Sequence, residues 1–330
     1  MVKKTFLLVG IALTWAVRAL ATPASCDADL HSGVNRVTVV SGGLDRTFDL
    51  SFPDSVKAHR VPLVIALHGS STDGATLDRE THISAAGTSK GFAVALPQGG
   101  IRLRRPDGGD GYYWNIPGVP LVNGSSTPAD APNDVQFIAD LIDHVVKHGC
   151  IDRRKIYVTG MSGGARMSSL LACQLANRVA AVAPVAGLRA GRATAPRFTE
   201  PDTGDCRPSK PISVLTLHGT DDAVNPFTGG LGVRWGYDVQ SAVARWASID
   251  RCPAPPTVER LSDHVSRSRY VGCARGVEVV SYTIDAPRDQ GGGHTWPGGH
   301  LDVPTARMVL GVSSREIDAT EVVLEFFLRH

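Results

Sequence analysis

Five short apolar runs constrain the fold of this chain more than any other feature of its sequence. Each ends in glycine or proline, and the runs are PLVIALHG (62–69), GFAVALP (91–97), KIYVTG (155–160), VAAVAPVAG (179–187) and ISVLTLHG (212–219). Runs of this length and composition are typical of strands buried on both faces of a parallel sheet. Helical patterns separate or follow them, at 133–149, 164–177, 237–249 and 318–330. The alternation predicts an α/β fold with a doubly wound, mostly parallel sheet and ligands at the carboxyl ends of its strands.

The remaining segments complete a single domain over residues 22–330. RVTVV (36–40) and RTFDLSF (46–52) flank SGG and predict an antiparallel N-terminal hairpin. Residues 97–132 are rich in glycine, proline and aspartate and lack hydrophobic periodicity, so we expect a loop over the functional edge of the sheet. Residues 188–210 form a second irregular excursion. The last helix has Asp318 as its expected N-cap.

The N-terminus has the composition of a secretory signal peptide. Lys3 and Lys4 precede an apolar run of about twelve residues, too short to span a bilayer, and Ala19-Leu20-Ala21 fits a cleavage site. We therefore expect residues 1–21 to be removed and the protein to be secreted, either extracellular or periplasmic. Loss of Lys3, Lys4 and Arg18 changes the formal charge from +2 to −1. This balance predicts neither a nucleic-acid partner nor a membrane partner after signal removal.

VTGMSGGARM (158–167) joins a predicted strand to a predicted helix through a G-x-S-x-G sequence. Flanking glycines allow a strand and a helix to approach closely while the serine between them occupies a strained turn. The pattern alone is weak in a glycine-rich chain, but its strand–helix context is the one that a catalytic serine requires. Ser162 is therefore the candidate nucleophile.

An acid and a histidine are expected downstream of such a serine, in that order. Asp221 and Asp222 follow the strand at 212–219 and are both candidates for the acid. GGGHTWPGGH (291–300) is a loop, because glycine and proline disfavour a helix interior and a central strand. His294 is the candidate base, whereas His300 lies beyond the turn and is expected to face solvent. No H-E-x-x-H or H-x-H spacing indicates a metal site, so we predict neither a metal nor an organic cofactor.

Two backbone N–H groups should form the oxyanion hole. One belongs to Gly163, which follows the nucleophile, and the other to Ser70, after the strand that ends in LHGS. The rings of His68 and His218 are expected to be structural. Four aromatic residues are candidates to line a substrate pocket, with ordinary packing as the alternative reading: Tyr113, Trp114, Phe227 and Trp296.

These motifs resemble those of secreted esterases related to polyhydroxybutyrate depolymerases and to feruloyl and acetylxylan esterases, in the α/β-hydrolase superfamily. The matching segments are LVIALHGS, DVQFIADLIDHVV, CIDRRKIYVTGMSGGARMSSLLAC, AAVAPVAG, LHGTDDAVNPFTGG and GGGHTWPGG. The resemblance extends from about residue 34 to the C-terminus. It implies an α/β-hydrolase fold and a serine esterase, with the acid at Asp222 and the histidine at His294.

Six cysteines in an exported chain suggest three disulfides, with fifteen possible connectivities. The resemblance implies a bridge between Cys252 and Cys273. The helix after the serine runs back along its strand, which suggests Cys150–Cys173. Elimination would then leave Cys26–Cys206.

The resemblance implies hydrolysis of an ester through an acyl-enzyme, with 3-hydroxybutyrate polyester or its oligomers as the substrate. Feruloyl or acetylated polysaccharide esters are an alternative, and an acyltransferase on the same fold is another. Two residues depart from the pattern of the family, Ser70 where relatives often carry Cys or Gly, and Arg166 where a small or apolar residue is common. We find no polymer-binding module in the sequence, which favours smaller or soluble esters.

Overall fold

The computed structural model describes Val2 and residues 33–57, 59–105, 108–230, 232–300 and 304–330. Apart from Val2, the predicted signal peptide lies outside these ranges. In this part of the chain, no helix combines the length and the apolar character needed to cross a membrane.

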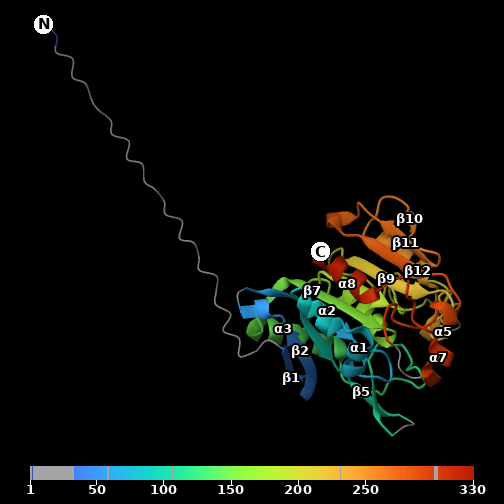
Figure 1. The fold of residues 1–330 in the computed structure, drawn as a ribbon, viewed down its shortest axis with the longest axis horizontal. Coiled ribbons are helices and arrows are strands. Elements are labelled where there is room, and N and C mark those ends of the chain that lie inside the picture. Colours follow the sequence, from blue (N-terminus) through green and yellow to red (C-terminus); the bar gives the residue numbers. More distant parts are fainter. Residues whose placement is uncertain (1, 3–32, 58, 106–107, 231, 301–303) are drawn as a thin grey trace.

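A mixed sheet of ten strands forms the centre of the molecule (Figure 1). In spatial order its strands are β1 (Gly33–Ser41), β2 (Leu44–Phe52), β4 (Ala93–Pro97), β3 (Val61–Leu67), β7 (Ile151–Met161), β8 (Ala181–Val185), β9 (Ser213–Gly219), β12 (Val279–Ile284), β11 (Val265–Tyr270) and β10 (Thr257–Arg260). The six strands from β4 to β12 run parallel, while the N-terminal hairpin and the β10–β11 pair add antiparallel edges. The predicted sheet and hairpin are confirmed.

Helices cover both faces of this sheet. They are α1 (Gly74–Thr81), α2 (Ile83–Ser89), α3 (Asp134–His148), α4 (Gly163–Gln174), α5 (Gly232–Trp235), α6 (Val239–Ile249), α7 (Pro304–Leu310) and α8 (Ala319–Leu328), with short 3-10 turns at Asp54–Lys57, Ala274–Gly276 and Arg288–Gln290. The four predicted helices correspond to α3, α4, α6 and α8. The predicted N-cap at Asp318 is also confirmed, because its side chain accepts a hydrogen bond from Glu321 N at 3.1 Å.

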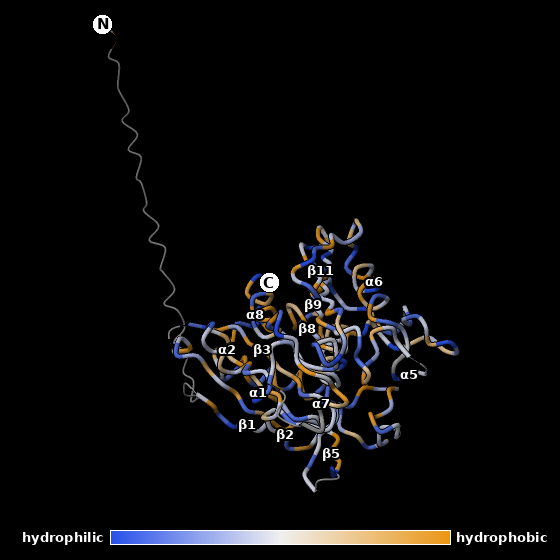
Figure 2. The backbone as a smooth tube through the Cα atoms, turned by 45° about the vertical axis from the view of Figure 1, so that its right-hand side comes forward, coloured by the Kyte–Doolittle hydropathy of each residue, from blue (hydrophilic) through white to orange (hydrophobic). Residues whose placement is uncertain are grey.

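Each face of the sheet has its own hydrophobic core, because successive side chains of a strand point to opposite faces. In β3, Leu63 and Ile65 pack with α3, α4 and α6, whereas Val64 and Ala66 pack with α1, α2 and α8. All four of these side chains are fully buried. Figure 2 shows the hydrophobic segments gathered in the interior and the hydrophilic ones around the outer loops. This double burial explains why the central strands are continuously apolar.

Residues 97–132 are more ordered than a simple loop. They contain a two-stranded hairpin, β5 (Ile101–Arg104) and β6 (Asp110–Tyr113). Ser71 N donates to Tyr112 O at 2.9 Å, and this bond ties the hairpin to the segment after β3. The hairpin strands are only four residues long and rich in arginine and glycine, so no hydrophobic periodicity marks them.

Two of the three suggested disulfides are wrong. Cys173 pairs with Cys206, with a Cα–Cα distance of 5.0 Å, so neither Cys150–Cys173 nor Cys26–Cys206 exists. The excursion after β8 returns alongside α4, where Arg189 N donates to Ser169 Oγ at 3.0 Å. That path brings Cys206, and not Cys150, to the far end of α4.

The other bridges involve the C-terminal half of the sheet and the start of β7. The Cys252–Cys273 bridge implied by the resemblance is confirmed. Cys150 is also disulfide-bonded, and Cys26 lies outside the described residues. Disulfides of this kind are found mainly in proteins of oxidising compartments.

Asp250, at the end of α6, gives a test of stability that does not involve the active site. Its Oδ1 accepts from Ile212 N at 3.0 Å, and burial raises the pKa of its carboxyl group to about 7. Between pH 4 and 7 the folded state therefore holds a proton that the unfolded state has lost, so this group stabilises the fold at low pH and less as pH rises. We expect Asp250→Asn to raise the free energy of unfolding at pH 8 by about 2–4 kcal/mol and to have little effect at pH 4.

The measurement is urea unfolding of both proteins at pH 4 and pH 8. Asp49, on β2, provides a control because its carboxylate pairs with Arg36 at the surface. Asp49→Asn should not stabilise the protein at either pH. Equal effects of Asp250→Asn at the two pH values would contradict the assignment of the raised pKa.

Candidate active site

Four candidate residues follow four parallel strands of the sheet. Ser70 follows β3, Ser162 follows β7, Asp222 follows β9 and His294 follows β12. These strands are neighbours in the order β3-β7-β8-β9-β12. Because they run parallel, their carboxyl ends meet at one edge, which brings residues far apart in the sequence into one site.

Ser162 lies in a sharp turn between β7 and α4. Its backbone has φ 56° and ψ −110°, which is a rare conformation for a residue with a side chain, and its N–H donates to Val185 O at 3.0 Å. The turn depends on close backbone packing, since a Cβ atom added at Gly164 would lie 2.1 Å from Leu67 O. The glycine in G-x-S-x-G therefore lets α4 begin directly against the end of β3.

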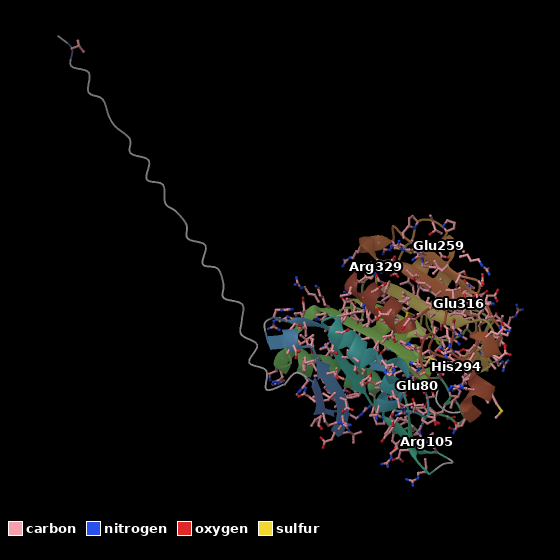
Figure 3. All side chains as sticks on the ribbon, viewed as in Figure 1. Glu80, Arg105, Glu259, His294, Glu316 and Arg329 are labelled. Atoms are coloured by element: carbon pink, nitrogen blue, oxygen red, sulfur yellow. A yellow bond between two sulfur atoms is a disulfide. The ribbon has the colours of Figure 1, made fainter. Side chains whose placement is uncertain are left out.

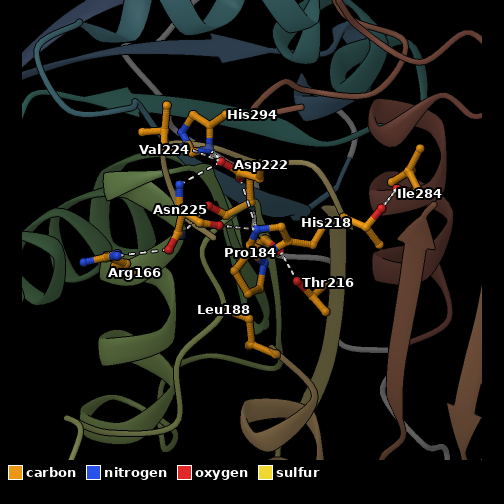
Figure 4. Close-up of polar contacts among 12 residues, drawn as sticks. Arg166, Pro184, Leu188, Thr216, His218, Asp222, Val224, Asn225, Ile284 and His294 are labelled. Carbon is orange, nitrogen blue, oxygen red and sulfur yellow. Dashed lines mark hydrogen bonds and ion pairs between the residues drawn. The ribbon is translucent and has the colours of Figure 1, made fainter. Parts of the chain in front are cut away.

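Asp222 and His294 are buried and hydrogen-bonded to each other (Figure 4). The distance from His294 Nδ1 to Asp222 Oδ2 is 2.6 Å. Because an ionised carboxylate only accepts hydrogen bonds, the histidine proton is assigned to Nδ1, which leaves Nε2 able to accept another proton. By contrast, Asp221 is half-buried and pairs with Arg288 at 2.9 Å. The structure thus brings Asp222, and not Asp221, to the histidine.

The Asp222 carboxylate has further hydrogen-bond donors. Its Oδ1 accepts from Val224 N at 2.9 Å and from Asn225 N at 2.7 Å. Burial raises the pKa of this carboxyl group, but the hydrogen bonds from His218 and His294 outweigh burial and hold it below its usual range. Asp222 is therefore ionised at neutral pH and fixed in orientation.

His218 is a residue at this site whose role the sequence analysis does not predict. Its Nε2 lies 3.1 Å from Asp222 Oδ2 and 2.9 Å from Asn225 O, in a fully buried position. Its ring is thus tied into the loop, as expected, but it also contacts the carboxylate that holds His294. The spacing of four residues between His218 and Asp222 in LHGTDD is a signal that could have indicated this contact.

The histidine loop is held by close backbone packing. His294 N donates to Leu310 O at 2.6 Å, and a Cβ atom added at Gly293 would lie 2.2 Å from that same oxygen. Trp296 Nε1 donates to Thr320 Oγ1 at 3.0 Å, which attaches the loop to α8. His300 is exposed, as expected from the sequence. Glycine is therefore required here so that the loop can pack against the end of α7.

Ser162 and His294 line one cavity of about 260 Å³. Leu77, Met161 and Trp296 contribute much of its apolar wall, and Glu80 lies at the same cavity, near His294 in Figure 3. A hydrogen bond from Ser162 Oγ to His294 is not among those made within the described part of the chain. Catalytic hydrogen bonds of this kind often close only when a substrate is bound.

The two candidate oxyanion donors lie next to each other. Gly163 is the first residue of α4, so its N–H has no partner within the helix. A Cβ atom added at Gly163 would lie 3.1 Å from Ser70 N. Both residues line a small recess that Ser162 also lines and His294 does not. We call this space the oxyanion recess.

The His68 ring supports the segment that carries Ser70, as a structural role predicts. Its Nε2 accepts from Gly99 N at 3.0 Å, so Nδ1 carries the proton and donates to Gly69 O at 2.7 Å. Burial lowers the pKa of His68 to about 4, which keeps the ring neutral. Trp114 Nε1 donates to His68 O at 2.8 Å and fixes the same segment.

The four aromatic pocket candidates occupy different places. Trp296 lines the large cavity, while Tyr113 and Trp114 line the oxyanion recess. Phe227 packs edge-on against His218, with ring centroids 5.8 Å apart, and is not among the residues that line either space. Among the described residues, no group of three or more histidine, cysteine, aspartate or glutamate side chains is arranged to hold a metal ion.

Comparison with known proteins gives a consistent set of matches. Residues 46–199 match the family described as esterase PHB depolymerase. Feruloyl esterase B of Piromyces equi is 29% identical over 252 residues, which cover 74% of this chain and 42% of that protein. NocK of Nocardia uniformis subsp. tsuyamanensis, named as an esterase, is 26% identical over 294 residues, which cover 81% of this chain and 74% of that protein.

Among solved structures, an acetyl xylan esterase from Aspergillus awamori has a similar fold. The TM-score is 0.52 at 15% sequence identity, and the match covers 84% of this chain and 98% of the other. At this level of identity the likeness concerns the fold, which is of the α/β-hydrolase type. The chain therefore spans less than half of Feruloyl esterase B but nearly the whole of this solved structure's fold.

Proposed function

We propose that this chain hydrolyses carboxylic esters with Ser162 as the nucleophile, and its matches to the family described as esterase PHB depolymerase and to a feruloyl esterase support this proposal. His294 is the general base and Asp222 positions it. The observation that carries this assignment is the 2.6 Å contact between His294 Nδ1 and Asp222, beside a cavity that Ser162 also lines.

In the proposed mechanism, His294 Nε2 accepts the proton of Ser162 as the serine oxygen attacks the ester carbonyl carbon. The carbonyl oxygen becomes an oxyanion, which the N–H groups of Gly163 and Ser70 stabilise. His294 then donates the proton to the leaving alkoxide, and the alcohol departs. Water, activated by His294, attacks the acyl-enzyme in the same way and releases the carboxylic acid and free Ser162.

Ester substrates of two kinds are candidates. We take 3-hydroxybutyrate polyester or its oligomers as the first, because the family matched by residues 46–199 is described by that chemistry. Feruloyl esters of plant polysaccharides are the second, because a relative with 29% identity is named a feruloyl esterase. The disulfides fit secretion into an oxidising compartment, so we propose an extracellular or periplasmic location.

The test is acid release by the chain from Thr22 onward, with methyl ferulate, a 3-hydroxybutyrate oligomer and 4-nitrophenyl butyrate measured side by side. Ser162→Ala serves as the blank. Release from the oligomer but not from ferulate is the expected result for the first substrate class, and the reverse result supports the second. No hydrolysis of the butyrate ester above the blank would contradict the assignment of Ser162.

A further inference from the structure

A second cavity, of about 180 Å³, lies next to the oxyanion recess and is rich in arginine. Its wall includes Arg166, Arg189, Arg192, Arg234, Tyr237 and Asp205. Arg166 and Arg234 line both this cavity and the oxyanion recess, so the two spaces share a wall and lie side by side. We call the second space the arginine cavity.

Among the described residues that line it, the arginine cavity has more positive than negative side chains. Its wall includes four guanidinium groups and one carboxylate, that of Asp205, which pairs with Arg192 at 2.9 Å. Arg166 and Arg189 both donate to the neutral Asn225 Oδ1, at 3.1 and 3.0 Å. The Asn225 amide therefore orients both guanidinium groups, and because it is neutral it does not cancel their charge.

The third arginine of this group also has a neutral partner. Arg234 Nη1 donates to Pro120 O at 2.6 Å. Burial and, to a smaller extent, the nearby Arg189 lower the pKa of Arg234 to about 10. Burial also lowers the pKa of Arg166, as do Arg189 and Arg234. Asp222 attracts the charge on Arg166, but it already accepts hydrogen bonds from two histidines. An anion in the cavity would relieve this mutual repulsion.

The proposed mechanism assigns the two sides of Ser162 to the two halves of an ester. The leaving oxygen must face His294, which lines the large apolar cavity and not the recess. The carbonyl oxygen must face the N–H groups of Gly163, which lines the recess and not the large cavity, and of Ser70, which lines both. We therefore place the alcohol in the large cavity and the acyl chain along the recess, which adjoins the arginine cavity.

The length of such an acyl chain follows from helix geometry. Arg166 N donates to Ser162 O at 3.1 Å, so Arg166 lies one helical turn beyond the nucleophile. One turn advances about 5.4 Å along the helix axis. An extended acyl chain of about four or five carbons has a comparable length, and we use this length for the test substrates.

We propose that the arginine cavity binds a carboxylate at the far end of the acyl group, so that the preferred substrates are monoesters of short dicarboxylic acids. This inference rests on the proposed function, because it uses the positions assigned to the alcohol and the oxyanion. The inference goes beyond the proposed function because it names a charged acyl group. Neither a feruloyl ester nor a hydroxyl-terminated 3-hydroxybutyryl unit provides such a group.

The test compares two ethyl esters of equal acyl length, monoethyl glutarate and ethyl pentanoate, by pH-stat titration. We expect kcat/KM for monoethyl glutarate to exceed that for ethyl pentanoate by about ten-fold or more. Arg234→Met should reduce this ratio by about ten- to one-hundred-fold, whereas Arg234→Lys should retain part of it. Arg166→Met should reduce the ratio similarly. Because Arg166 also contacts Asn225, its replacement can change the rate with every ester. The rate with ethyl pentanoate corrects for such a general change.

Arg178→Met is the matched control, since Arg178 lies at the surface and pairs with Asp143 at 2.5 Å. Its ratio should equal that of the unaltered protein. Equal rates for the two esters, or a ratio unchanged in both Arg166→Met and Arg234→Met, would overturn the proposal. So would an arginine-dependent preference for the pentanoate ester of 3-hydroxypropanoate, whose carboxylate is on the alcohol. Failure to hydrolyse either ester above Ser162→Ala would instead contradict the proposed function.

Discussion

Replacing Ser162 by alanine should lower kcat for 4-nitrophenyl butyrate by about ten thousand- to a million-fold. The substitution removes the one oxygen that can form the acyl-enzyme, while the backbone N–H groups of Gly163 and Ser70 remain to polarise the carbonyl. Residual hydrolysis should therefore persist above the rate in water. The measurement is kcat from initial rates, together with a search for the acyl-enzyme by intact-protein mass spectrometry, which should detect it only when Ser162 is present.

Ser168 on α4 provides a matched control. Its buried hydroxyl donates to Gly164 O at 2.8 Å, and it does not line the cavity. Ser168→Ala tests whether loss of a hydroxyl from this helix is enough to disturb the site, and we expect kcat to change by less than about ten-fold. If Ser162→Ala retained the activity of Ser168→Ala, the nucleophile would have to be another residue.

Asp222→Asn should lower kcat by about ten thousand-fold, because it changes which nitrogen of His294 carries the proton. Val224 N and Asn225 N both donate to Asp222 Oδ1, so the carbonyl oxygen of an introduced amide should face them. The NH₂ group would then face His294 Nδ1, which would have to accept a hydrogen bond. The proton would move to Nε2, where it blocks transfer from Ser162.

Asp221→Asn separates this effect from a general loss of charge. Asp221 precedes Asp222 in the chain, but its carboxylate pairs with Arg288 outside the buried site. Its replacement should change kcat by less than about ten-fold. Comparable losses in Asp221→Asn and Asp222→Asn would contradict the distinct role of Asp222. The thermal stability of both variants should be recorded, since Asp222 also accepts two hydrogen bonds from the backbone that follows it.

The sequence predicts those strands and helices whose hydrophobic pattern reflects the burial of their own residues. β3 and β9 are buried on both faces, and their residues form continuous apolar runs. The order and context of Ser162, Asp222 and His294 could be predicted for the same reason, because each follows an element that lies in or beside the sheet. The choice between Asp221 and Asp222 came from the resemblance and not from the pattern.

Other elements could not be predicted because distant contacts stabilise them. β10 is exposed throughout and exists through pairing with β11, and β5 pairs with β6 across a turn. The bridge from Cys173 to Cys206 depends on the path of an irregular segment, which no local pattern encodes. The same holds for the arginine cavity, since Arg166, Arg189 and Arg234 come from three separate segments. In the sequence, Arg166 is distinguished only as a departure from the pattern of the family.

The candidate catalytic groups and the walls of the arginine cavity come from different parts of the chain. The former follow the central strands and are fixed by both hydrophobic cores. The latter come largely from the segments between these strands, where Arg189 lies after β8 and Arg234 lies in α5 beside Pro120. If the cavity selects the acyl group as proposed, substitutions in these segments should change which acyl groups are accepted while the chemistry at Ser162 is preserved. Such a division makes the fold evolvable, because new substrate ranges can arise by natural variation without passing through inactive intermediates.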